Sequence, residues 1–138
     1  MFTERRILVV EDESLVRALL DILLSSSGYM PMFAETAAQA CLAIDGAELI
    51  PFSALVVDID LKGPRDGFEA ADYARAAFPD LPVIYTTGGS QHLIPSRGVP
   101  GAVLVAKPYQ PEELIAALDR LTGPKAANTG DELFAPQA

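Results

Sequence analysis

Five short apolar runs alternate along the chain with segments whose apolar residues recur at helical spacing. The runs occupy residues 7–10, 29–33, 54–58, 83–87 and 103–106, and the helical segments occupy residues 13–27, 37–47, 68–78 and 111–121. Most of the runs are continuously apolar, as strands buried on both faces of a parallel sheet are. The alternation therefore predicts an α/β protein, with a doubly wound, five-stranded parallel sheet covered by helices on both faces.

Local signals support the ends of these elements. Thr36, followed three residues later by Gln39, predicts a capping box at the start of the second helix. Pro111 suits the first turn of the last helix. Residues 88–101 are rich in Gly, Pro and Ser, so we expect no more than a short helix there, at residues 91–94.

Length and composition limit the class of protein. The chain has 138 residues, and 50% of them are hydrophobic, which suffices for one domain, placed at residues 1–121, followed by a flexible C-terminal tail at residues 122–138. The net charge of −9 argues against nucleic-acid binding, which needs clusters of Lys and Arg. The sequence contains neither a signal peptide nor an apolar run of the roughly 18 residues that cross a bilayer. We therefore expect a cytoplasmic protein that does not bind membranes.

Polar side chains stand at the carboxyl ends of four of the predicted strands. In chain order they are Glu11 and Asp12, then Asp58 and Asp60, then Thr87, and finally Lys107. In open parallel sheets these strand ends form one edge, where ligands bind. Crowded carboxylates repel one another unless a cation lies among them, and Mg²⁺ prefers oxygen ligands, often carboxylates together with a phosphate oxygen. The pattern thus predicts a site for Mg²⁺ and a phosphoryl group.

Three of these residues suit the chemistry of a phosphoryl group. Asp58 is placed to be a carboxylate nucleophile, while the Thr87 hydroxyl and the Lys107 ammonium could each contact a phosphoryl oxygen. Taken one at a time, such residues have commoner structural roles, because acids at strand ends are frequently turn or cap residues. The hypothesis depends on their order, with each residue at the end of its own strand.

The sequence resembles the receiver domain of two-component response regulators over residues 4–121. The similarity is carried by "VVEDE" at 9–13, "VVDIDL" at 56–61, "PVIYTTG" at 82–88 and "AKPY" at 106–109. The resemblance implies a flavodoxin-like sheet in the strand order 2-1-3-4-5. Because we expect only a short tail after residue 121, we also expect a stand-alone response regulator. Such a protein is a phosphoacceptor signalling domain rather than an enzyme, with a downstream protein target that the sequence does not identify.

The resemblance assigns the catalytic roles as follows. Asp58 would accept a phosphoryl group from a phosphohistidine on a histidine kinase or a histidine phosphotransfer protein. Thr87 and Lys107 would contact the phosphoryl oxygens. The bond between Lys107 and Pro108 would be a cis peptide, which proline makes tolerable.

The resemblance also implies the ligands of a Mg²⁺ cofactor. Asp12 and Asp58 would bind the ion with their carboxylates, Glu11 would bind it through water, and Asp60 would bind it through its backbone carbonyl. Nothing else in the sequence points to a further cofactor.

Several positions depart from the family pattern. Glu11 stands where the family more often has Asp, and Gly67 lies one residue further from Asp58 than usual. Leu104 occupies the usual place of a switch aromatic, three residues before the lysine. The coupling in which that ring turns inward therefore cannot operate here, which leaves the signalling face open.

The stretch "YTTGG" at 85–89 is similar to the motif of the FAT GUY subclass of single-domain receivers, with Tyr85 in the position of the Phe. The two glycines at its end suit a hinge. We therefore expect residues 87–102 to be the segment that moves on phosphorylation.

Two other interpretations remain open. "VVDIDL" also resembles the opening motif of haloacid-dehalogenase-type phosphohydrolases, with Asp58 as nucleophile and Asp60 as general acid/base. Against that family, the acidic pair precedes Asp58, Lys62 replaces a usually small residue, and residues 1–57 would be an unexplained prefix. The second alternative is a receiver-like binding module that is not phosphorylated.

Overall fold

The computed structural model describes residues 5–123, and residues 1–4 and 124–138 lie outside the described part. The elements, in chain order, are β1 (Arg6–Val10), α1 (Ser14–Ser26), β2 (Met30–Ala34), α2 (Ala37–Asp45), β3 (Ala54–Asp58), α3 (Gly67–Ala77), β4 (Val83–Thr87), a 3₁₀ turn (Gln91–Leu93), α4 (Ile94–Arg97), β5 (Val103–Ala106) and α5 (Pro111–Thr122). The predicted tail at 122–138 lies almost wholly outside this range, so it stays a prediction.

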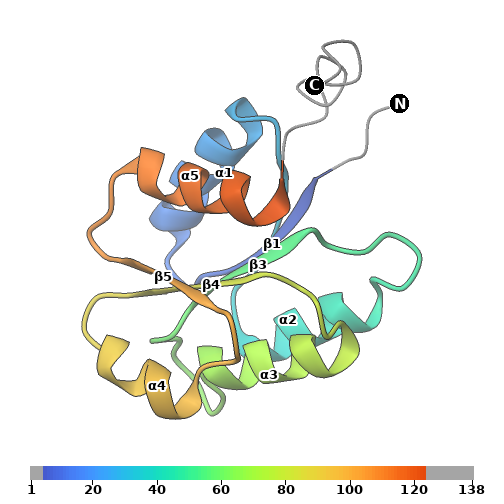
Figure 1. Ribbon diagram of the computed structural model, residues 1–138, viewed down its shortest axis with the longest axis vertical. Coiled ribbons are helices and arrows are strands. Elements are labelled where there is room, and N and C mark those ends of the chain that lie inside the picture. The colour runs from blue at the N-terminus through green and yellow to red at the C-terminus, as the bar shows by residue number, and fades with distance from the viewer. Residues whose placement is uncertain (1–4, 124–138) are drawn as a thin grey trace.

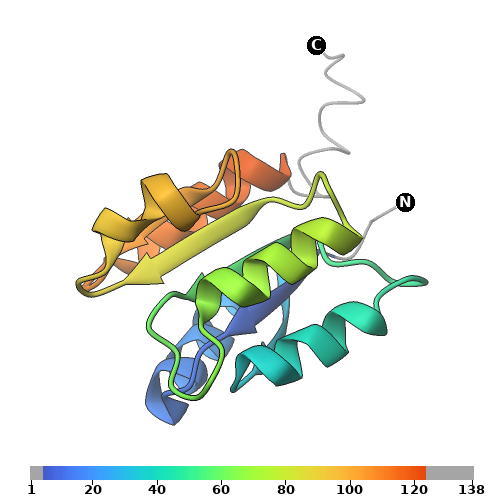
Figure 2. The ribbon, with the colours of Figure 1, turned by 90° about the horizontal axis from the view of Figure 1, so that it is seen from below.

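The five strands form one parallel sheet in the order β2-β1-β3-β4-β5. Helices α1 and α5 cover one face of the sheet, and α2, α3 and the short α4 lie across the other (Figures 1 and 2). Each face has its own apolar core, and β3 and β4 are buried along their whole length. This confirms the predicted doubly wound α/β fold. Within the described residues, no helix has both the length and the hydropathy that crossing a bilayer requires.

Local details differ from the sequence-based expectations at the start of α2. The Thr36 hydroxyl accepts a hydrogen bond from the Gln39 amide at 3.1 Å, as predicted. The Gln39 side chain, however, accepts from the backbone of Glu35 at 2.7 Å and not from that of Thr36, so the predicted capping box is only half correct. A complete capping box forms at α3 instead, and at α5 the Glu113 side chain accepts from the Gln110 amide at 2.7 Å.

The carboxyl ends of the strands lie at one edge of the sheet, as the sequence predicted. All five strands run in the same direction, so the carboxyl ends of β1, β3, β4 and β5 form one edge of the sheet (Figure 1). The short 3₁₀ turn and α4 occupy the region in which only a short helix was expected. The result is an open edge bounded by the loops that follow β1, β3, β4 and β5.

Candidate functional site

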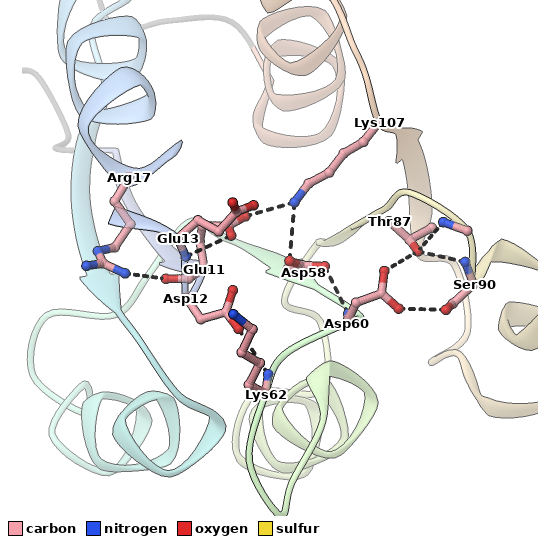
Figure 3. Close-up of polar contacts among 11 residues, drawn as sticks. Glu11, Asp12, Glu13, Arg17, Asp58, Asp60, Lys62, Thr87, Ser90 and Lys107 are labelled. Atoms are coloured by element: carbon pink, nitrogen blue, oxygen red, sulfur yellow. Dashed lines mark hydrogen bonds and ion pairs between the residues drawn. The ribbon is translucent and has the colours of Figure 1, made fainter. Parts of the chain in front are cut away.

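Asp58 is the last residue of β3 and lies at the centre of this edge (Figure 3). Its side chain is buried, yet both carboxylate oxygens have partners. The Lys107 ammonium lies 3.2 Å from Oδ2, and the backbone amide of Asp60 donates to Oδ1 at 2.9 Å. A buried carboxylate needs such partners because burial without them is costly.

Lys107 joins two acidic side chains. Its ammonium lies 3.1 Å from Glu11 Oε1 as well as 3.2 Å from Asp58. Burial alone would lower the pKa of Lys107, but the charges of Asp58 and Glu11 outweigh it, so the pKa is raised above its usual value. The ammonium therefore stays charged between the carboxylates. The bond from Lys107 to Pro108 is cis, as the resemblance implied.

Glu11 is the most buried of the acidic side chains at the edge, at 2% exposure. Burial raises the pKa of its carboxyl group above the usual value, although the Glu13 amide and Lys107 both favour the charged form. The Glu13 amide donates to its Oε2 at 3.2 Å. A cation added beside Glu11 would therefore compete with a proton.

Carboxylate oxygens of Glu11, Asp12 and Asp58 lie within 4.8 Å of one another. Asp12 is held toward the group by the backbone amide of Lys62, which donates to its Oδ2 at 3.0 Å. An all-oxygen donor set of this kind fits a hard divalent cation. Three of the four predicted metal ligands are thus brought together by their side chains.

The Asp60 side chain turns the other way, toward the loop that follows β4 (Figure 3). The Thr87 hydroxyl donates to its Oδ2 at 2.6 Å, and the Ser90 hydroxyl donates to its Oδ1 at 2.6 Å. The pKa of the Asp60 carboxyl group is lowered, because these bonds, the Gly88 amide and the Lys107 charge outweigh the effect of partial burial, which acts in the opposite direction. The sequence predicted a role only for the backbone carbonyl of Asp60, as a metal ligand. The hydrogen bonds of its side chain to Thr87 and Ser90 were not predicted.

Sequence reasoning missed two residues that shape this edge. Ser90 lies in a stretch where small polar residues are common, so nothing singled it out. Arg17 on α1 donates to the Glu11 carbonyl at 2.9 Å. A basic residue in the first turn of a helix that follows an acidic pair was a signal that could have pointed to this contact.

The structure also shows what surrounds the strand position at which a switch aromatic was expected. Leu104 on β5 is 39% exposed, whereas Tyr85, its partner on β4, is fully buried. The Tyr85 hydroxyl accepts a hydrogen bond from the Val99 amide at 3.0 Å. The ring of Tyr85 is therefore buried on β4, while the strand position expected for the switch aromatic holds an exposed leucine.

A family model for the response regulator receiver domain matches residues 7–119. The chain belongs to this family. Receiver domains are phosphoacceptor signalling modules rather than conventional enzymes, so the phosphohydrolase interpretation is not favoured. Membership of the FAT GUY subclass stays a prediction.

Curated relatives are response regulators. The receiver matches the response regulator receiver protein CpdR of Brucella abortus with 29% identity, over 85% of this chain and 96% of that protein. It matches the transcriptional regulatory protein TcrA of Mycobacterium tuberculosis with 33% identity, over 85% of this chain and 46% of that protein. The NtrX-like putative response regulator of Rickettsia conorii is 30% identical over 83% of this chain, which spans 24% of that relative. The chain thus spans a quarter to a half of the last two relatives.

Solved structures agree with the fold. A response regulator receiver protein from Sinorhizobium medicae superposes with a TM-score of 0.81 at 26% identity, covering 86% of this chain and 94% of the other. The receiver domain of the sensor histidine kinase PA1611 from Pseudomonas aeruginosa superposes with a TM-score of 0.75 at 24% identity, covering 88% and 99%. That second structure has a magnesium ion coordinated in its active-site cleft.

Proposed function

We propose that this receiver domain takes a phosphoryl group onto Asp58 from a phosphohistidine of a histidine kinase or a histidine phosphotransfer protein. One observation carries the proposal: the Lys107 ammonium lies within 3.2 Å of Asp58 and at 3.1 Å from Glu11. A lysine between two buried acids keeps one carboxylate ionised while leaving a positive charge for an incoming phosphoryl group.

The donor set supports Mg²⁺ as the cofactor. Glu11, Asp12 and Asp58 supply carboxylate oxygens, and the backbone carbonyl of Asp60 is proposed as a fourth ligand. When bound, Mg²⁺ would offset the negative charge of the phosphoryl group and of the acids around it. The magnesium ion in the structure of the PA1611 receiver domain supports this assignment.

In the proposed transfer, an Asp58 oxygen forms a bond to phosphorus as the phosphorus–nitrogen bond of the donor breaks. The imidazole leaves with the electron pair and takes up a proton from solvent. Lys107 would bind one phosphoryl oxygen and Thr87 would bind another. The cycle closes when water attacks the phosphorus of the acyl phosphate: the bond from phosphorus to the Asp58 oxygen breaks, inorganic phosphate leaves, and the Asp58 carboxylate is regenerated.

We infer that the output of this receiver is a change in protein contacts. The match to CpdR across 96% of that receiver protein supports a stand-alone role, and we propose a cytoplasmic location with no binding of nucleic acid or membranes. Residues 87–102 are the segment proposed to move when Asp58 is phosphorylated.

The test is incubation with a small acyl phosphate and Mg²⁺, followed by intact mass. We expect a gain of one phosphate, which is absent in Asp58→Asn and retained in Asp80→Asn, a matched change of an exposed acid in a turn. Omitting Mg²⁺ should abolish the gain.

Other outcomes of this experiment favour the alternatives. Sustained release of phosphate from a simple phosphate ester would favour the phosphohydrolase. No gain of mass with either the acyl phosphate or a phosphohistidine donor would favour a receiver-like binding module that is not phosphorylated.

A further inference from the structure

The carboxylate of Asp60 ties the end of β3 to the loop that follows β4. Two hydroxyl groups, from Thr87 and Ser90, donate to its two oxygens at 2.6 Å each. The backbone amide of Asp60 also donates to Asp58 at 2.9 Å. The residue that follows the phosphoacceptor by two positions therefore contacts both the acceptor and the loop (Figure 3).

The Thr87 hydroxyl has no remaining capacity to donate. A hydroxyl group carries one proton and two lone pairs. The proton is used toward Asp60, while the amides of Gly89 and Ser90 donate to the Thr87 oxygen at 3.2 Å and 2.9 Å. Thr87 cannot donate to a phosphoryl oxygen on Asp58 until it leaves Asp60.

The bonds that hold Thr87 are of the stronger kind. Hydrogen bonds to an ionised carboxylate are shorter and roughly twice as strong as those between neutral groups, and an aspartate carboxyl group is ionised at neutral pH. Both hydroxyl groups lie on the same short stretch of chain, so breaking one weakens the hold on the other.

We propose that Asp60, Thr87 and Ser90 form a latch in the unphosphorylated protein. The latch holds the β4–α4 loop against the end of β3 through the two hydrogen bonds to Asp60. In this latch the Asp60 carboxylate competes with the phosphoryl group for the Thr87 hydroxyl. The inference rests on the proposed function, because it supposes that Asp58 is the acceptor. Asp60 acts here as a positioning residue through its side chain, in addition to the metal contact proposed for its backbone carbonyl.

The latch has a consequence for the phosphorylated state. Once Thr87 turns to the phosphoryl group, the Asp60 carboxylate loses a hydrogen-bond donor. It is also repelled by the negative charge that the phosphoryl group adds. The latch therefore opposes phosphorylation, and opening it releases the loop at Ser90. Because Ser90 also donates to Asp60, the latch holds the loop three residues beyond Thr87. A change in the Thr87 side chain alone would leave that second bond in place.

Two variants separate the latch from a simple effect of charge. Asp60→Ala removes both hydrogen bonds and one negative charge, whereas Ser90→Ala removes one hydrogen bond and leaves the charge and the proposed catalytic residues in place. Both side chains are outside the apolar core, and Asp60 is exposed, so the variants are expected to fold.

The first measurement is hydrogen exchange at the Gly89 and Ser90 amides in unphosphorylated protein. We expect exchange to be about tenfold faster in Asp60→Ala and about threefold faster in Ser90→Ala, as loss of one or two charge-assisted bonds implies. The amide of Val105, in β5, is the internal reference. Wild-type exchange rates at Gly89 and Ser90 in Asp60→Ala would overturn the latch.

The second measurement is the initial rate of phosphorylation by the small acyl phosphate with Mg²⁺. We expect a rate about tenfold higher in Asp60→Ala and two- to threefold higher in Ser90→Ala. If Asp60→Ala is faster but Ser90→Ala matches the wild type, charge repulsion explains the effect and the competition is wrong. If neither the wild type nor any variant gains phosphate, the proposed function fails. Hydrogen exchange at the Gly89 and Ser90 amides needs no phosphate, so it still decides whether Asp60 holds the loop.

Discussion

Gly67 offers the sharpest test of how the fold supports the candidate site. This residue begins α3, and a methyl group placed on it would lie 2.2 Å from the carbonyl oxygen of Asp58. Real Cβ atoms essentially never approach another heavy atom within 3.0 Å. In Gly67→Ala, either α3 or the end of β3 must therefore move by about 0.8 Å, and the atom in contact is backbone that cannot turn aside.

The size of the effect follows from two opposing contributions. Replacing glycine with alanine in a helix stabilises a protein by about 0.4–1 kcal/mol, because the unfolded chain loses freedom. Overpacking costs about 1–3 kcal/mol, and more where backbone must shift. We expect Gly67→Ala to lower the free energy of unfolding by about 2 kcal/mol, and to slow phosphorylation because the displaced backbone is that of Asp58.

Urea unfolding measures this loss, with Gly46→Ala as the matched control. At Gly46 the added methyl group would meet backbone oxygens at 3.8 and 3.9 Å, which is ordinary contact, so that variant should be as stable as the wild type or slightly more. If Gly67→Ala unfolds at the same urea concentration as Gly46→Ala, the close approach of α3 to Asp58 is not a feature of the folded protein.

Three further predictions concern charge and hydrogen bonding. Lys107→Met should lose about 2–3 kcal/mol of stability at pH 7 by urea unfolding, because it leaves two buried acids without their shared cation; the loss should shrink at pH 4, and an equal loss at both values would contradict this. The raised pKa of Glu11 means that the folded protein binds its proton more tightly, so stability falls as pH rises from 4.5 through the folded-state pKa. In metal-free buffer the stability of Glu11→Gln relative to wild type should therefore increase across that window, and a pH-independent difference would count against it. Tyr85→Phe should cost about 1–2 kcal/mol, because the buried Val99 amide loses its acceptor, whereas Tyr73→Phe, at a side chain 39% exposed, should cost under about 0.5 kcal/mol; equal losses would refute the argument.

The strand-end residues could be predicted because two simple rules place them. Continuous apolar runs identify buried parallel strands, and parallel strands put their carboxyl ends at one edge. These rules predict that Asp58, Lys107 and the acidic pair at 11–12 lie together. The distances of 3.1 and 3.2 Å at Lys107, and the cluster of Glu11, Asp12 and Asp58 oxygens, show that they do.

Side-chain directions and close approaches could not be predicted from the same rules. The turn of Asp60 toward Thr87 depends on the path of two loops, and loops carry no periodic signal. The clearance at Gly67 depends on where α3 starts relative to β3, which the path of the loop at residues 59–66 sets. The incomplete capping box at Thr36 has a similar cause. The backbone before α2 places the Glu35 amide, and not the Thr36 amide, within reach of the Gln39 side chain.

The loop after β4 is fixed at both ends by residues close to the site. At its start, Thr87 is bound to Asp60, and at its far end the Val99 amide is bound to Tyr85, two residues before Thr87 on the same strand. Between them, Arg97 pairs with the helix cap of α3 at 2.8 Å and lies 4.6 Å from the ring of Phe68. Since Leu104 provides no ring that could turn inward, we expect phosphorylation of Asp58 to act on this loop at the Thr87 end, where Thr87 and Ser90 donate hydrogen bonds to Asp60. The Val99 end is held by a buried hydrogen bond to Tyr85, so we expect it to move less than the Thr87 end.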